Sequence, residues 1–278
     1  MELIAFLIAN LIVFVLGASI GSFLNVVIYR VPAGLSILHP PSRCPQCLTR
    51  LGLAENVPIL GWLWLQGRCK HCRTRISPRY PIVEAVVGIL FLVVFWLTGT
   101  RIETVGYWMF FSWLFALALI DLDTLTLPNA LTQSGLLAGL GFQVALGIEQ
   151  SPDWIWINSP AIPEGLITGI LGAVVGIWLL DSISLIGSMM LGKTAMGAGD
   201  SKLAAMMGAW LGWKLLLVAG FVACGLGAFV GGGAIALKLI NRQQPIPFGP
   251  FLAVGAGIAA LGGSVLITTY LDLFFPLR

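Results

Sequence analysis

Long apolar runs of about 20 residues constrain this chain more than any other feature, because each run is long enough to cross a bilayer as a helix. The first run extends from Leu3 to Val27 without a charged residue. Of the 278 residues, 58% are hydrophobic and only 10% are charged, whereas a soluble domain carries about 25% charged residues. The composition therefore excludes an ordinary soluble enzyme and predicts an all-α polytopic membrane protein.

The hydropathy pattern predicts about eight transmembrane helices and one small polar insert. We expect a first helix at 1–29, an insert at 30–80 and a seven-helix membrane core at 81–278. The sixth span is the weakest, since only a short apolar stretch separates Lys202 from Lys214. We expect Ala195–Asp200 to enter the membrane as irregular backbone that protein or a wet cavity must cover. The expected spans are 3–29, 82–98, 104–120, 129–147, 163–187, 196–213, 215–238 and 250–271.

The distribution of positive charge predicts the orientation. Eight of the fifteen Lys and Arg residues lie between Arg30 and Arg79, a stretch with a single acidic residue, Glu55. Short loops rich in Lys and Arg mark the cytoplasmic side of a membrane. Alternation of the spans then places the loops 121–128 and 188–199 inside and the loop 148–162 outside.

Four cysteines in the insert predict a metal site. They form two CxxC pairs, Cys44 with Cys47 and Cys69 with Cys72, separated by 21 residues. This spacing is typical of a four-cysteine Zn²⁺ site, which would be structural because protein fills all four ligand positions. A pair of disulfides is the alternative, disfavoured in a reducing compartment. His39 and His71 are alternative ligands, and we expect the fifth cysteine, Cys224, to be a small core residue.

Two aspartates at predicted helix ends are the candidate catalytic groups. Asp121 and Asp200 are 79 residues apart in sequence, yet the topology puts both at the cytoplasmic end of a helix. Acidic residues at such positions are costly and usually functional. Two carboxyl groups at close range share one proton, so one can activate water while the other polarises a carbonyl. Gly197 and Gly199 would let backbone approach a substrate strand closely.

Simpler roles stay open for the neighbouring acids. An aspartate at a helix end is often solvated or caps the next helix. For Asp123, this role is as consistent with the sequence as a supporting role in catalysis. Asp181 could pair with Lys193 or Lys202, or help to receive a basic substrate.

Ordered motifs run through nearly the whole chain. They are GSFLNVV at 21–27, YRVP at 29–32, ENVP at 55–58 between the CxxC pairs, RYPIVE at 79–84, IDLDTLTLPN at 120–129, MGAGDSKL at 196–203 and IPFGP at 246–250. This set resembles the type IV prepilin peptidases, which are bifunctional leader peptidases and N-methyltransferases with a GxGD aspartyl protease motif.

The resemblance implies that Asp121 and Asp200 form the catalytic pair. It favours Asp121 over Asp123, because Asp121 stands seven residues before Pro128, as the family's catalytic aspartate does. The remaining residues with an expected supporting or substrate-binding role are Asp123, Gly197, Gly199, Lys202 and Glu84. Thr194 departs from the family pattern, which often has Glu there.

The resemblance also implies a substrate and a location. The substrates would be prepilins or pseudopilins, cut after a glycine that ends a short basic leader. S-adenosylmethionine would then methylate the new N-terminus, and the sequence does not assign residues that bind it. The protein would lie in a bacterial inner membrane, in contact with lipid and not nucleic acid, with the zinc insert and the active site on the cytoplasmic side.

Three other functions remain as alternatives. A proton-coupled transporter would need acids near the bilayer midplane and repeat symmetry. A zinc-bearing assembly factor would not need Asp121 or Asp200. A peptidase without methyltransferase activity would need the aspartates but no methyl donor.

Overall fold

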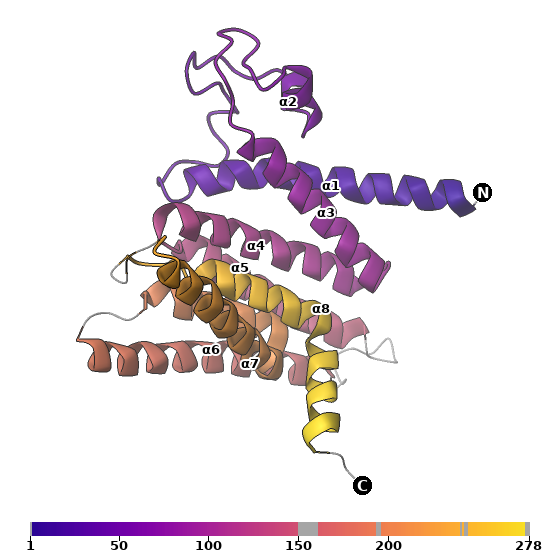
Figure 1. The fold of residues 1–278 in the computed structure, drawn as a ribbon. Helices are drawn as coiled ribbons and strands as arrows, with labels where there is room; N and C mark the ends of the chain where they lie inside the picture. The colour runs from indigo at the N-terminus through magenta and orange to yellow at the C-terminus, as the bar shows by residue number, and fades with distance from the viewer. Residues whose placement is uncertain (1, 150–160, 193–195, 240, 242–243, 276–278) are drawn as a thin grey trace. The chain divides into compact units, whose positions relative to one another are not determined.

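The structure is a computed structural model that describes residues 2–149, 161–192, 196–239, 241 and 244–275. These residues are mainly helical and contain no strand, which confirms the prediction of an all-α protein. They divide into two compact units, Met1–Thr104 and Val105–Arg278. The helices in chain order are α1 (Glu2–Arg30), the short 3₁₀ helix η1 (Ala54–Asn56), α2 (Leu60–Trp64), α3 (Arg79–Thr98), α4 (Ile102–Thr124), α5 (Asn129–Glu149), α6 (Ala161–Leu191), α7 (Ala198–Ala236) and α8 (Gly249–Phe274) (Figure 1).

Within the described residues, seven helices are long and apolar enough to cross a membrane, compared with about eight expected spans. The difference lies in α7, which has 39 residues. A straight helix of that length would extend for about 58 Å, far more than the roughly 30 Å of a bilayer core. The helix is interrupted at Gly212, whose φ of 71° and ψ of 170° are not helical.

The contacts of α7 indicate that the chain reverses direction at Gly212. Before this residue, Gly208 meets Gly172 of α6 and Ala204 meets Gly176. After it, Leu215 lies against Gly263 deep in α8, whereas Gly231 lies against Ile246, just before α8 begins. The two segments therefore correspond to the expected spans 196–213 and 215–238, joined as one helical hairpin.

In the first unit, α1 and α3 pack closely through small residues. A Cβ on Gly17 would lie 2.9 Å from the Cα of Gly88, and a Cβ on Gly21 would lie 2.8 Å from the Cα of Glu84. The Asn25 side-chain amide also donates a hydrogen bond to the Tyr80 carbonyl at 3.2 Å. Small residues allow this approach, which matters in lipid because helices there associate by packing rather than by the hydrophobic effect.

In the second unit, Trp210 of α7 is the centre of a buried cluster with α4 and α5. Its indole N–H donates to the Gly135 carbonyl at 2.8 Å, and its own carbonyl accepts from the Gln143 amide at 2.9 Å. Its ring stacks on Phe110 with centroids 5.2 Å apart. These interactions fix the first segment of α7, which begins at Ala198 and contains Asp200 in its first turn, against α4 and α5. By contrast, Cys224 is exposed on α7, so the expectation of a core position is wrong.

The contact between α6 and α7 predicts a specific sensitivity to side-chain volume. A Cβ on Gly208 would overlap the Gly172 carbonyl, whereas a Cβ on Gly220, also in α7, would meet no atom within 4 Å. We expect Gly208→Val to lower stability by about 1–3 kcal/mol or more through overpacking, and Gly220→Val to have little effect. Thermal unfolding in detergent measures both variants, and equal stability of the two would contradict this packing.

Candidate active site and metal centre

The two predicted catalytic aspartates lie in the same unit and interact. Asp121 is in the last turn of α4 and Asp200 is in the first turn of α7. Asp121 is 5% exposed and Asp200 8% exposed, and the two carboxyl groups are close enough to interact electrostatically. Acidic side chains buried this deeply are rare unless they are paired or functional. The hairpin of α7 and the packing around Trp210 bring these distant positions together.

The start of α8 binds Asp121 directly. The backbone N–H of Gly249 donates a hydrogen bond to Oδ2 of Asp121 at 2.8 Å. The first N–H groups of a helix have no partner within the helix, and they favour negative charge. A Cβ on Gly249 would lie only 2.7 Å from the same oxygen. Glycine is therefore the residue that allows this approach, a role that the IPFGP motif alone did not reveal.

The GxGD segment is fitted against the chain that follows Asp121. Gly197 is extended (φ −74°, ψ 144°) and its carbonyl accepts from the N–H of Asp200 at 3.1 Å. A Cβ on Gly199 would lie 3.0 Å from Cβ of Leu127. Nζ of Lys202 donates to Oδ1 of Asn129 at 2.8 Å. Lys202 thus joins the two aspartate motifs, and Asn129 is a partner that the sequence analysis missed.

The other predicted residues are not part of the buried pair. Asp123 and Asp181 are exposed, and both Lys193 and Thr194 are outside the described residues. Glu84 belongs to the first unit and is 8% exposed. Its carboxylate accepts a hydrogen bond from the N–H of Ile59 at 2.7 Å, which attaches the polar insert to α3.

The four cysteines of the insert form one cluster. Their Sγ atoms all lie within 4.8 Å of one another. The Sγ atoms of Cys44 and Cys72 are 3.7 Å apart, and those of Cys47 and Cys69 are 3.9 Å apart. Four thiolates around one ion with metal–sulfur bonds of about 2.3 Å would have sulfurs separated by about 3.8 Å. These separations exceed a disulfide bond of about 2.05 Å, so the geometry fits a metal ion. The two histidines are not part of the cluster.

The two halves of the metal centre are copies of one local design. The sequences RCPQCLTRL at 43–51 and RCKHCRTRI at 68–76 are identical at five of nine positions. In each copy the second residue after the CxxC pair, Thr49 or Thr74, accepts from the N–H of the first cysteine, at 3.0 Å and 2.9 Å. The backbones of the flanking arginines pair as isolated antiparallel β-bridges, Arg43 with Arg50 and Arg68 with Arg75. This repeat is visible in the sequence, and the sequence analysis missed it.

The threonine of each copy also lowers the pKa of the second cysteine in that copy. Hydrogen bonding from Thr74 lowers the pKa of Cys72 to about 6, and Thr49 lowers the pKa of Cys47 in the same way. A thiol must lose its proton to bind a metal ion. At the second cysteine of each copy, the lowered pKa thus favours the thiolate form that binds a metal ion.

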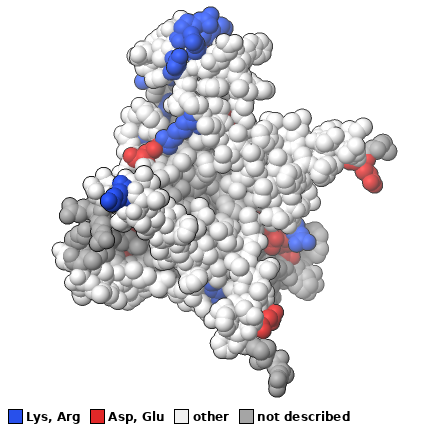
Figure 2. Space-filling view, viewed as in Figure 1, with Lys and Arg blue, Asp and Glu red and all other residues white. Residues whose placement is uncertain are grey.

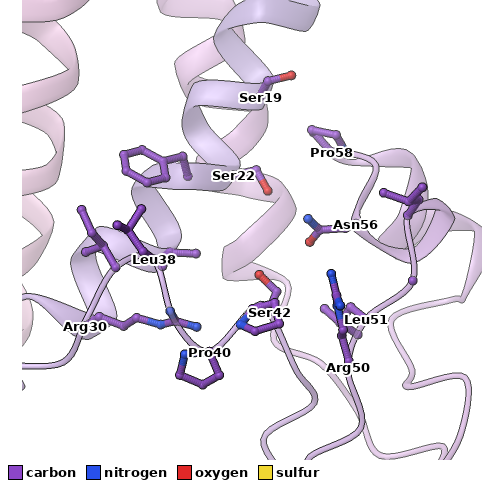
Figure 3. A pocket seen from close by; sticks show the side chains of 16 residues that line it. Ser19, Ser22, Arg30, Leu38, Pro40, Ser42, Arg50, Leu51, Asn56 and Pro58 are labelled. Atoms are coloured by element: carbon purple, nitrogen blue, oxygen red, sulfur yellow. The ribbon is translucent and has the colours of Figure 1, made fainter.

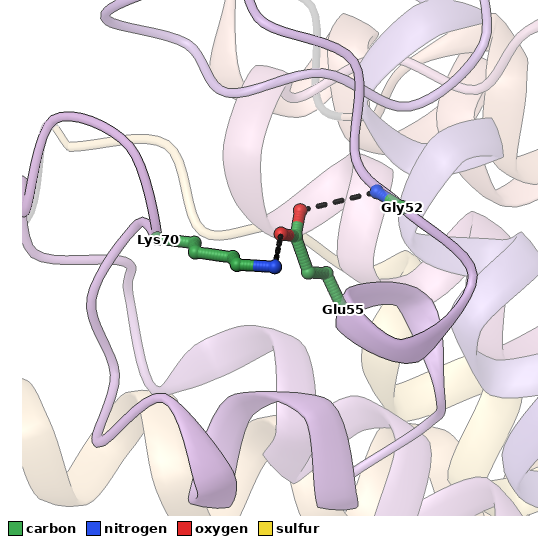
Figure 4. A network of polar contacts seen from close by, with 3 residues as sticks. All are labelled: Gly52, Glu55 and Lys70. Carbon is green, nitrogen blue, oxygen red and sulfur yellow. Dashed lines mark hydrogen bonds and ion pairs between the residues drawn. The ribbon is translucent and has the colours of Figure 1, made fainter.

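Polar contacts fasten the two copies to each other. Glu55 accepts a hydrogen bond from the N–H of Gly52 at 3.1 Å and faces Nζ of Lys70 at 3.8 Å (Figure 4). In the second copy, the Ile76 carbonyl accepts from the indole N–H of Trp62 at 3.2 Å. Lys and Arg side chains gather on the outside of this insert (Figure 2). The insert has few buried apolar residues, so these polar contacts and the metal centre carry much of its order.

Two family models match this chain, one in its N-terminal part and one in the part that contains the aspartates. Residues 15–98 match the bacterial peptidase A24 N-terminal domain, and residues 108–232, which contain both aspartates, match the type IV leader peptidase family. The prepilin leader peptidase/N-methyltransferase of Aeromonas hydrophila is 35% identical over 95% of this chain and 94% of its own length. The chain belongs to this family. Proteins of the same name from Pseudomonas putida (35% identical over 93% of this chain and 92% of their own length) and Myxococcus xanthus (40% over 84% and 64%) are also similar.

No solved structure matches the chain. Family membership makes the chain an aspartyl peptidase and N-methyltransferase, and a multi-pass protein of the inner membrane. The peptidase match contains Asp121 and Asp200, whereas the four-cysteine cluster lies in the separate N-terminal match.

The contact with Gly249 predicts a sensitive point in this peptidase. We expect Gly249→Ala to lower the rate of leader cleavage by about tenfold to 100-fold, because the added methyl group displaces the Asp121 carboxylate. Gly262→Ala in the same helix is the control, since a Cβ there meets no atom within 4 Å. Single-turnover cleavage of a precursor measures both variants, and full activity of Gly249→Ala would contradict the proposed fit.

The metal centre predicts how bound metal depends on individual cysteines. We expect Cys69→Ser to lose the metal ion, because a closed four-thiolate site tolerates the loss of a ligand poorly. Cys224→Ser, which changes the exposed fifth cysteine on α7, should retain it. Elemental analysis of the purified proteins after dialysis gives the metal content. Equal content in the two variants would show that the cluster is not the metal site.

Proposed function

We propose that this protein cuts the short basic leader from prepilins or pseudopilins at the cytoplasmic face of the inner membrane and then methylates the new N-terminus. The observation that carries the proposal is the buried pair of Asp121 and Asp200, which interact although they come from different helices. The family's peptidase match spans both residues, and relatives that cover almost the whole chain are named for both activities.

The pair supplies the two functions that peptide hydrolysis requires. One carboxylate takes a proton from a water molecule as that water attacks the scissile carbonyl, and the other carboxyl group donates a hydrogen bond to the carbonyl oxygen. Because the two groups are close, they hold one proton between them. Asp121 receives the N–H of Gly249 at the start of α8, and Asp200 is itself in the first turn of α7. Each carboxyl group thus lies beside backbone N–H groups at the start of a helix, α8 for Asp121 and α7 for Asp200.

The position of the pair at the ends of helices supports the substrate class. A pilin precursor carries a basic leader in front of an apolar helix, so its scissile bond lies at the membrane boundary. Asp121 is near the end of α4 and Asp200 near the beginning of α7, where a bond at this depth would be accessible. A transporter would instead place its acids in the middle of spanning helices. Asp123, which is exposed near Asp121, and Lys202, which is bonded to Asn129, are proposed to support the site and the substrate.

The metal in the insert is proposed to be zinc with a structural role. The ligands would be Cys44, Cys47, Cys69 and Cys72, which offer the four thiolates that structural zinc prefers. With all ligand positions taken by protein, no position remains for a substrate. S-adenosylmethionine is the proposed methyl donor, and it supplies a methyl group bound to a positively charged sulfur.

Amide variants of the aspartates test the peptidase. We expect Asp121→Asn and Asp200→Asn each to reduce cleavage by a factor on the order of 10²–10⁴, because an amide can neither activate water nor share a proton. Asp272→Asn, an exposed position in α8, is the control with the same chemical change. The measurement is cleavage of a model prepilin in detergent or liposomes, with metal content as a check on folding. Continued cleavage by the double amide variant would disprove the proposal.

A further inference from the structure

The first unit contains a cavity of about 460 Å³ between α1 and the first copy of the metal centre (Figure 3). Pockets for small ligands and cofactors have volumes of about 300–1,000 Å³. The cavity belongs to the unit that matches the N-terminal domain model, whereas both catalytic aspartates belong to the other unit. The peptidase chemistry therefore does not account for it.

One face of α1 forms the first wall. Ser19, Ser22, Phe23, Val26 and Arg30 line the cavity, and their spacing of three or four residues puts them on one side of the helix. This wall is apolar in the middle and polar at both ends. The guanidinium of Arg30 donates to the Ser36 carbonyl at 3.0 Å, and a guanidinium has further N–H donors available for a ligand.

The first copy of the metal centre forms the opposite wall. Ser42, Arg50 and Leu51 line the cavity, and the N–H of Leu51 donates to the Ser42 carbonyl at 2.9 Å, next to the bond between Cys44 and Thr49. Asn56 of η1 completes this wall, and Figure 3 shows its side chain and that of Arg50 pointing into the same space as Ser22. The metal centre thus holds half of the cavity in place.

The charges around the cavity match a ligand with both signs of charge. Arg30 and Arg50 are suited to a carboxylate. Among the described residues, no acidic side chain lines the cavity directly, but the Glu84 carboxylate is hydrogen-bonded to two of its edges. It accepts from Ser22 on α1 and from the N–H of Ile59, which follows the lining residue Pro58. The Glu84 carboxyl group therefore lies at the edge of the cavity that Ser22 and Pro58 form.

We propose that this cavity is the binding site for S-adenosylmethionine. Arg50 and Arg30 would bind the carboxylate of its amino-acid part, Ser22 and Asn56 its hydroxyl or base nitrogen atoms, and Phe23 and Val26 the flat face of its adenine. Glu84 would offset the positive charge on sulfur. An anionic lipid headgroup would satisfy the two arginines, but it would not use Glu84 or the apolar middle of the wall. The inference rests on the proposed methyltransferase activity.

The transfer reaction needs no other reactant. The nitrogen of the new N-terminal amine forms a bond to the methyl carbon, and the bond from that carbon to sulfur breaks. The electron pair of the broken bond stays on sulfur, which becomes neutral, and the amine releases one proton. The residues of the cavity hold the donor during this step.

The repeat in the metal centre provides a matched experiment. Arg50 and Arg75 occupy equivalent positions in the two copies, and each pairs through its backbone in an equivalent β-bridge. Both side chains are exposed. Of the two, only Arg50 lines the cavity. We expect Arg50→Glu in the full-length protein to weaken binding of tritiated S-adenosylmethionine by at least about tenfold. Arg75→Glu, with the same change in charge, should bind like the wild type. The measurement is equilibrium dialysis in detergent, with bound zinc as the check on folding.

The possible outcomes distinguish an error in the assigned binding site from an error in the proposed methyltransferase activity. Equal binding by wild type and Arg50→Glu would overturn the assigned site and leave the methyltransferase intact. Absence of binding and of methylation in the wild type would overturn the proposed methyltransferase itself. If Arg50→Glu instead loses a co-purified anionic phospholipid, detected by mass spectrometry, while S-adenosylmethionine binding is unchanged, the cavity is a headgroup site and the proposal is wrong. Ser22→Trp, which fills the cavity from the other wall, should repeat the loss of binding without a change in charge.

Discussion

Two buried carboxyl groups within reach of each other repel when both are charged, and the second unit is organised around holding them together. Asp121 is in the last turn of α4 and Asp200 is in the first turn of α7, so the pair forms only when these two helices pack together. The start of α8 supplies the N–H of Gly249 to Asp121, and Trp210 fixes the first segment of α7 against α5. Packing far from the aspartates thus sets the position of the two carboxyl groups.

Glycine is the residue that makes this arrangement possible in lipid. At Gly249 the absence of a side chain lets backbone reach a carboxylate, and at Gly208 it lets α7 approach α6. At Gly212 a positive φ allows the chain to reverse. These three roles differ physically, although each residue looks like an ordinary small residue in a membrane helix. An apolar side chain at any of these positions would add contact area and still disturb the site.

The sequence predicted the helical class, the four cysteines as one cluster and the two aspartates, because charge is costly in lipid and CxxC spacing is restrictive. It did not predict that two expected spans form the single interrupted helix α7, since hydropathy carries no information about the φ of Gly212. It also gave no partner for Asp121, because the hydrogen bond to Gly249 joins residues 128 positions apart. The role of Glu84 toward Ile59 likewise depends on how the insert folds back onto α3.

Different interactions stabilise the two units. The second unit has long apolar helices, and close helix packing is sufficient to order it. The insert of the first unit has short elements and exposed side chains, so it depends on thiolates, on Glu55 and on Glu84. Because Arg50 belongs to the Cys44 copy, loss of the metal would disorder this wall of the cavity. The metal centre therefore matters to the first unit as a scaffold, and its chemistry need not take part in either reaction.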